Sequence, residues 1–332
     1  MLLLLNNFPI LNGNTLELHY GLIDETHSMD AIVQNKCEYE FLGIIKEIAA
    51  IFNAEIIIET EPLAEGGLRR WFKIISKEES KKSTIKIALV VALTTGILIT
   101  PITSSISKMT EIFIERIFED KEIKKLEKEK LKLEIEKLKR DSKINAEILG
   151  KNNTIKKRRS NFYEALDKYC KVKMISLIIE DESKKIMIKE EKIDRVNFKE
   201  FILVSDDLEP QEIDGAVIEI ISPVLKRGNY KWMGIYKGEA IHFNMASKEF
   251  KTLVQTGKVE FKNGTSINCF LQIKKKVDND AREKITAYDV VRVNHYFENE
   301  TPIETPEGKR HRQKKEGEKN QLKMFDEGEI IT

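Results

Sequence analysis

Residues 87–107 read IALVVALTTGILITPITSSIS, and none of these 21 residues is charged, although Asp, Glu, Lys and Arg make up 33% of the chain. A helix of this length is about long enough to cross the hydrocarbon core of a bilayer. Small side chains recur every fourth residue, which places them on one helical face: Ala88, Ala92, Gly96, Thr100 and Ser104. Such a face lets transmembrane helices pack closely. The segment is therefore expected to be a transmembrane helix that packs against copies of itself.

Seven serine and threonine residues distinguish this segment from a simple membrane anchor. Hydroxyl groups in a membrane helix bond to a neighbouring helix or to their own carbonyls, or they face a water-filled lumen. The candidates to meet water are Thr94, Thr95, Thr103 and Ser107. Pro101 allows a kink or a re-entrant turn, which would keep the flanking domains on one side of the membrane. The alternative interpretation is a buried helix in the core of a soluble domain.

The composition bounds the class of protein. A chain of 332 residues has room for two or three domains, and a net charge of +1 gives no global preference for nucleic acid. The three scattered cysteines indicate reduced thiols in a cytoplasmic setting. The first residues lack the basic region of a signal peptide, so residues 87–107 would be the only route to a membrane. No phosphate loop, nucleophile elbow or Ser/His/Asp grouping is present, so we expect neither an enzyme nor a cofactor.

The chain divides by composition into five segments of an overall α+β fold. Residues 1–76 are expected to form a small α/β domain, and residues 77–108 a basic linker and the transmembrane helix. Residues 109–150 are expected to form a long amphipathic helix. Residues 157–300 are expected to form a β-rich α+β domain that senses a ligand, and residues 301–332 a disordered basic tail.

The long helix has the spacing of a coiled coil. Residues at 4-3-4-3-4 intervals form its seam: Leu131, Ile135, Leu138, Ser142, Asn145 and Leu149. A charged helix packed on its own chain is the open alternative. In the β-rich domain, Asn263-Gly264 predicts a hairpin between strands at 259–261 and 267–273.

Two basic clusters are candidates for ligand binding. One directly follows the long helix and comprises Lys156, Lys157, Arg158 and Arg159. The other comprises Lys226 and Arg227 in a turn, with Lys231 and Trp232 after it. Basic side chains beside aromatic ones suit an anionic, stackable ligand such as a nucleotide or a single-stranded oligonucleotide. The alternative is that Trp232 and Tyr236 belong to the core and the lysines are solvated.

Two further patterns concern a metal site and a partner protein. His19, Asp24, His27 and Asp30 include zinc and manganese ligands, but Asp30 has a simpler use at the start of a helix, so we assign no metal site. Near the end of the chain, residues 321–325 (Gln-Leu-Lys-Met-Phe) are similar to the peptide by which bacterial DNA-processing proteins bind the sliding clamp. A clamp contact through Gln321, Leu322 and Phe325 is therefore a candidate.

In the order of its parts the chain resembles the membrane effectors of bacterial antiphage systems controlled by nucleotide signals, nearest the Hailong effector. The resemblance rests on residues 87–107, the helix at 123–149 and the β-rich domain that follows. It implies an oligomeric effector or channel in the bacterial inner membrane, with its folded domains in the cytoplasm. It also implies gating by a nucleotide or oligodeoxynucleotide that a partner nucleotidyltransferase makes. The alternatives are a membrane-tethered scaffold without a pore, or a soluble oligomer with the apolar helix as core.

Overall fold

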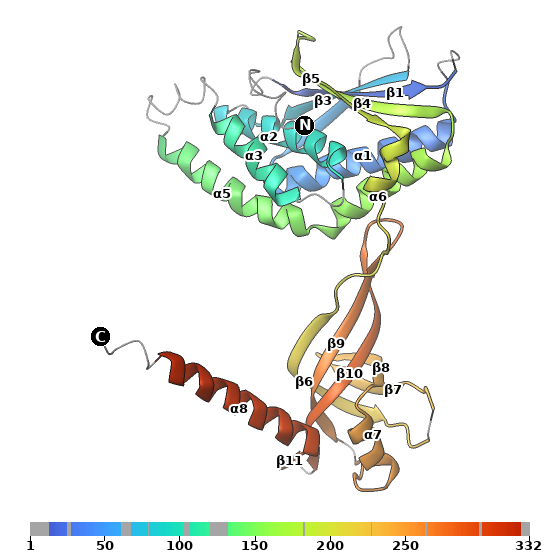
Figure 1. Cartoon of the computed structure of the whole chain (residues 1–332), viewed down its shortest axis with the longest axis vertical. Coiled ribbons are helices and arrows are strands. Elements are labelled where there is room, and N and C mark those ends of the chain that lie inside the picture. The colour runs from blue at the N-terminus through green and yellow to red at the C-terminus, as the bar shows by residue number, and fades with distance from the viewer. Residues whose placement is uncertain are drawn as a thin grey trace. The chain divides into compact units, whose positions relative to one another are not determined.

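The computed structural model describes residues 13–24, 28–60, 68–78, 80–101, 106–119, 132–181, 183–226, 228–262, 264–298 and 301–326. As expected, the fold is mixed α+β. The chain forms two compact units, coloured along the sequence in Figure 1. Unit 1 comprises Met1–Asp206 and Asn279–Arg282, and unit 2 comprises Asp207–Asp278 and Glu283–Thr332.

Unit 1 is built on a five-stranded antiparallel sheet in the order β2-β3-β1-β4-β5. Its strands are β1 (Thr15–Leu22), β2 (Ile56–Thr60), β3 (Leu68–Ser76), β4 (Val172–Glu180) and β5 (Ile186–Asp194). The central strand β1 pairs with β3 on one side and with β4 on the other. The sheet therefore needs strands from beyond residue 170, and a domain boundary at residue 76 is wrong.

Helices cover one face of this sheet (Figure 1). They are α1 (Ala31–Ile51), α2 (Lys81–Ile99), α3 (Ile106–Phe118), α5 (Lys132–Lys151) and α6 (Asn153–Lys168), followed by the short 3-10 helix η3 (Arg195–Phe201). Asp30 caps α1 by accepting from the backbone amides of Ile32 and Val33, at 2.8 and 3.1 Å. The structural use considered for Asp30 is thus confirmed.

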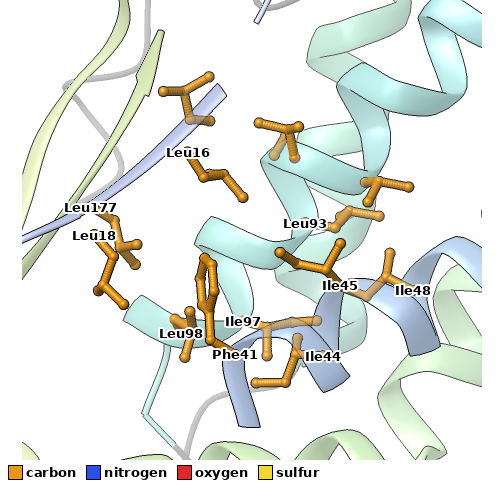
Figure 2. Packing of buried hydrophobic residues seen from close by; sticks show 14 of the residues in the cluster. Leu16, Leu18, Phe41, Ile44, Ile45, Ile48, Leu93, Ile97, Leu98 and Leu177 are labelled. Carbon is orange, nitrogen blue, oxygen red and sulfur yellow. The ribbon is translucent and has the colours of Figure 1, made fainter. Parts of the chain in front are cut away.

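The uncharged segment forms α2, and α2 lies in the core of unit 1. Figure 2 shows Leu93 and Ile97 of α2 packed with Ile45 and Ile48 of α1, beside Leu16 of β1. Every side chain from position 88 to position 93 is fully buried. The helix begins after a capping box of Ser80 and Ser83 and ends at Ile99, just before Pro101.

The expected single helix over residues 109–150 is not observed, because the described residues of this range form α3 and α5, which pack on each other. Gly150 of α5 lies against Ser107 of α3, and Lys143 is 3.6 Å from Glu115, so the two helices run antiparallel. The described seam residues of α5 are mostly buried: Ile135, Leu138, Ser142 and Leu149, with Asn145 half-buried and Leu131 outside the described residues. The pattern that predicted a coiled coil thus marks a helix packed on its own chain.

Unit 2 is a closed five-stranded barrel with an added edge strand and two helices. Its elements are β6 (Gln211–Ser222), β7 (Trp232–Tyr236), β8 (Glu239–Met245), α7 (Lys248–Gln255), β9 (Ser266–Val277), β10 (Glu283–Glu298), β11 (Thr301–Glu304) and α8 (Pro306–Asp326). The strands pair in the ring β6-β7-β8-β10-β9, and β9 pairs with β6 to close it. Only the pairing of β8 with β10 within this ring is parallel. With α7 between the third and fourth barrel strands, this connectivity is that of the OB fold.

Two local expectations in unit 2 are wrong. Residues 259–261 form a loop between α7 and β9, so the residues around Asn263-Gly264 do not join two strands; the amide of Thr265 bonds to the carbonyl of Lys262 at 3.0 Å. Residues 301–326, expected to belong to a disordered tail, form β11 and α8, and residues 327–332 lie outside the described residues. The start of α8 is fixed because Glu307 accepts from the Ser247 hydroxyl at 2.5 Å and from the Val293 amide at 2.8 Å.

Candidate nucleic-acid interface

The outer face of β7 and β8 is a mixed apolar and aromatic surface. Along both strands, alternate side chains point into the barrel and leave the others facing out. Met233 lies opposite His242 and Ile235 lies opposite Ala240 in the antiparallel register. His242 and Ala240 are exposed and the other two are half-buried. In OB barrels the second and third strands, which are β7 and β8 here, form the face that binds oligonucleotides or oligosaccharides.

The loop between β6 and β7, residues 223–231, adds basic and aromatic side chains. Lys226 and Lys231 are exposed, and Tyr230 is 62% exposed. Arg227 lies outside the described residues. A phenol ring presented to solvent beside lysines can stack on a base while the lysines meet phosphates. This is the first loop of the barrel, and OB folds use that loop for ligands.

Helix α7 holds this loop in place. The Lys251 ammonium donates to the carbonyl of Gly228 at 3.0 Å, and the Gln255 amide donates to the carbonyl of Lys226 at 3.4 Å. Gly228 has a φ of +146°, and a Cβ there would lie 2.7 Å from the Tyr230 ring. Glycine is thus required for the ring to fold over the loop backbone. A loop restrained in this way loses less conformational entropy when it binds.

The sequence from the β6–β7 loop to the segment before β9 is rich in basic residues, although the whole chain is near neutral. Residues 226–262 include eight lysines and arginines and three glutamates. Most of the lysines are exposed: Lys226, Lys231, Lys237, Lys248, Lys258 and Lys262. Such a concentration attracts polyanions more strongly than the net charge suggests.

Trp232, a predicted ligand residue, belongs to the barrel core. Its side chain is fully buried, and its ring lies 5.8 Å from Phe261 and 6.1 Å from Phe243, between centroids. Tyr236 is also buried, so the alternative that placed both aromatics in the core is confirmed. The sequence missed His242, Met233 and the rest of the outer face, because only the closed barrel shows which strands share it.

The basic run after α5 serves structural roles in unit 1. Arg159 is 1% exposed, and its guanidinium donates to the carbonyls of Thr100 at 2.7 Å and Ile97 at 3.3 Å, which end α2. The Tyr163 hydroxyl donates to the carbonyl of Leu98, in the same last turn of α2, at 2.6 Å. Burial lowers the pKa of Arg159 to about 10, which leaves the side chain charged at neutral pH. Arg159 therefore caps a helix and is not accessible to a ligand.

The neighbours of Arg159 are also engaged. Lys157 is buried and forms a 2.6 Å ion pair with Asp206, and Arg158 forms a 3.1 Å ion pair with Glu40. Lys156 is half-buried. We therefore leave Lys156, Lys157 and Arg158 out of the candidate interface.

The small-residue face of α2 packs within the chain. A Cβ at Gly96 would lie 2.4 Å from Sδ of Met109 and 2.8 Å from the Phe113 ring, so this glycine lets α3 approach α2. Ala88, Ala92 and Thr100 are buried too. The hydroxyls of Thr94, Thr95 and Thr100 each donate to a carbonyl four residues earlier in α2. Ser107 is half-buried, and Thr103 and Ser104 lie outside the described residues.

The candidate metal ligands and the candidate clamp peptide do not form a site among the described residues. Among the described residues, no group of His, Cys, Asp and Glu side chains is arranged to hold a metal ion. His19 is 3.5 Å from the Ser176 hydroxyl, Asp24 pairs with Lys171 at 3.1 Å, and His27 lies outside the described residues. Residues 321–325 lie on α8, in a part where side chains are not described, so the clamp contact stays a prediction.

Within the described part of the chain, α2 is the one helix that is long and apolar enough to cross a membrane. Its window Lys82–Ile99 has a mean hydropathy of 1.7, and 78% of it is buried inside the protein. Length and composition do not separate a core helix from a membrane span. No protein-family model, curated protein or solved structure matches the chain.

Proposed function

We propose that this protein binds a nucleotide or oligonucleotide through unit 2. The ligand lies on the outer face of β7 and β8 and on the β6–β7 loop. The observation that carries the proposal is the coincidence of two features: the barrel has OB connectivity, and exposed Lys226, Tyr230 and Lys231 fall on its first loop. Topology alone assigns no function, and these side chains supply the chemistry.

In this proposal the lysines of the loop contact phosphates, and Tyr230 and His242 stack on bases. Stacking on aromatic rings tolerates any base, so little sequence preference is expected. The restraint of the loop by Lys251 and Gln255 keeps Tyr230 exposed before the ligand arrives. The proposed activity is binding without chemical conversion.

The test is the affinity of the full chain for a fluorescent single-stranded oligonucleotide at several salt concentrations. Each phosphate contact contributes about 0.7 to the slope of log affinity against log salt. The double substitution Lys226→Ala, Lys231→Ala should therefore reduce the slope by about 1.4. The matched control is Lys46→Ala with Lys199→Ala, two exposed lysines of unit 1, which should leave the slope unchanged. An equal effect of both pairs would contradict the proposal.

For α2 we propose the role of a core helix in unit 1. What supports this is its burial between α1, α3 and the sheet, and the capping of its last carbonyls by Arg159 and Tyr163. The protein is then a soluble binding protein.

The second candidate is the membrane effector or channel of a nucleotide-controlled defence system, gated by the same ligand. The length and composition of α2 favour it. It requires α2 to leave the core of unit 1 and to pack on copies of itself. Membrane fractionation separates the two: a core helix predicts protein that carbonate extracts into the soluble fraction, and a channel predicts protein retained in the membrane together with dye-reported depolarisation.

A further inference from the structure

A groove runs beside the β6–β7 loop in unit 2. Its volume is about 820 Å³, within the range of small-molecule pockets. The end of β6 and the loop form one wall, and α7 with the segment before β9 forms the other. The apolar lining includes Ile221, Pro223, Leu225, Val254, Val259 and Phe261.

Two side chains of this groove are unusually exposed for their type. Leu225 is 64% exposed and Ile221 is 49% exposed. Both line the same groove, so a ligand that enters it would remove apolar surface from water. Across from them, the partly exposed ring of Phe261 is braced edge-on against Trp232 and offers an aromatic surface.

The polar residues of the groove suit a nucleobase. Glu219 and Glu260 line it, and carboxylates accept hydrogen bonds from the amino groups of bases. Lys262 also lines it, with its ammonium 3.9 Å from a carboxylate oxygen of Glu260, and both side chains are exposed enough for the lysine to turn to a phosphate. A flat ligand with apolar faces and polar edges matches this combination of aliphatic walls, one ring and few charges.

The groove is continuous with the loop of the proposed interface. Leu225 of the groove precedes Lys226 of the loop, and Gln255, another lining residue, bonds to the carbonyl of Lys226. A strand whose phosphates lie along this loop therefore brings a neighbouring base to the groove. In a duplex the base would first have to be unpaired and unstacked, which costs free energy that a single strand does not have to supply.

We infer that this groove receives one unpaired base of the bound strand, so that the ligand is single-stranded nucleic acid and not duplex. The inference rests on the proposed function and adds the class of substrate to it.

The test compares Leu225→Ser with Val217→Ser in the full chain. Val217 is a matched control because it is a 52% exposed aliphatic residue of β6 outside the groove. Both positions are exposed, so both variants should keep the thermal midpoint of the wild type. The probes are a fluorescent 12-nucleotide single strand and the duplex of the same sequence, measured by anisotropy.

The expected result is that the wild type binds the single strand at least about tenfold more tightly than the duplex. Leu225→Ser should weaken single-strand binding about fivefold, which corresponds to about 1 kcal/mol. Duplex binding should not change, and Val217→Ser should stay within about twofold of the wild type.

The failures are distinguishable. If Lys226→Ala, Lys231→Ala weakens binding but Leu225→Ser does not, the groove inference is overturned and the proposed function stands. Equal affinity of the wild type for the single strand and the duplex would also overturn the groove inference and leave the proposed function standing. If neither nucleic acid binds the wild type, the proposed function falls and the inference with it. As a second measurement, photocrosslinking of a strand that carries 5-iodouracil should label residues 257–262, and labelling confined to other segments would overturn the inference.

Discussion

The cap that Arg159 places on α2 gives a quantitative prediction about unit 1. In Arg159→Met the carbonyls of Thr100 and Ile97 lose their buried donor. Each unsatisfied buried carbonyl costs about 1–3 kcal/mol, and the substitution recovers part of the desolvation of the guanidinium. We expect a net loss of about 2–4 kcal/mol, which for a unit of this size is a fall in midpoint of roughly 5–15 °C.

The chain offers a convenient reporter for this loss. Its two tryptophans are divided between the units, with Trp71 in unit 1 and Trp232 in unit 2. In a Trp232→Phe background, fluorescence therefore follows the unfolding of unit 1. The control is Arg140→Met, on the exposed side of α5, which should leave the midpoint within about 1 °C. If Arg159→Met also leaves the thermal midpoint of unit 1 unchanged, α2 does not end against α6 and its role as a core helix is refuted.

Three further changes test other contacts. Gly96→Leu should destabilise unit 1 by about 1–3 kcal/mol, because its side chain must displace Met109 and Phe113; an unchanged urea midpoint would contradict the packing of α3 on α2. Burial raises the pKa of Glu40, so the folded state holds this proton more tightly than the unfolded state, and unit 1 should lose stability as pH rises from the ordinary glutamate pKa through the raised one. Glu40→Gln should flatten the stability profile above the ordinary glutamate pKa, while the same change at the exposed Glu111 of α3 should leave the profile as it is. Glu307→Ala removes two hydrogen bonds that hold α8, so trypsin should cleave residues 309–315 faster than in Glu318→Ala; equal rates would show that Glu307 does not anchor the helix.

Local patterns in the sequence predicted many elements but not their pairing. The alternating residues of β7 (WMGIY) and β8 (EAIHFNM) are typical of strands with one buried face, as observed. The sequence could not place β4 beside β1, since more than 140 residues separate them and register depends on the assembled sheet. The parallel pairing of β8 with β10 within the barrel is hidden for the same reason.

The interpretation of α2 shows a second limit. A helix surrounded by protein on every side is apolar all round, as a membrane helix is, so hydrophobicity does not tell the two apart. The seam on α5 is a similar case, because a helix in an antiparallel hairpin and one in a coiled coil bury nearly the same positions. The small residue Gly96 is explained only by the structure, which shows that Met109 and Phe113 of α3 pack against it.

For the candidate interface, the sequence located the loop but not the surface around it. Lys226 and Lys231 were singled out as basic residues beside aromatics, and they are exposed. Arg159 belonged to an equally basic run and is buried, because it finds carbonyl partners that composition cannot reveal. His242 had no signal beyond its position in a strand, and its place on the outer face follows from the register with Met233.

The most direct test of the central claim is amide hydrogen exchange of the full chain with and without a saturating 12-nucleotide single strand. Binding at the proposed interface predicts slower exchange at residues 223–236, 239–245 and 257–262, and unchanged exchange in the sheet of unit 1. Protection confined to unit 1, or no protection at all, would contradict the claim that the barrel of unit 2 binds nucleic acid.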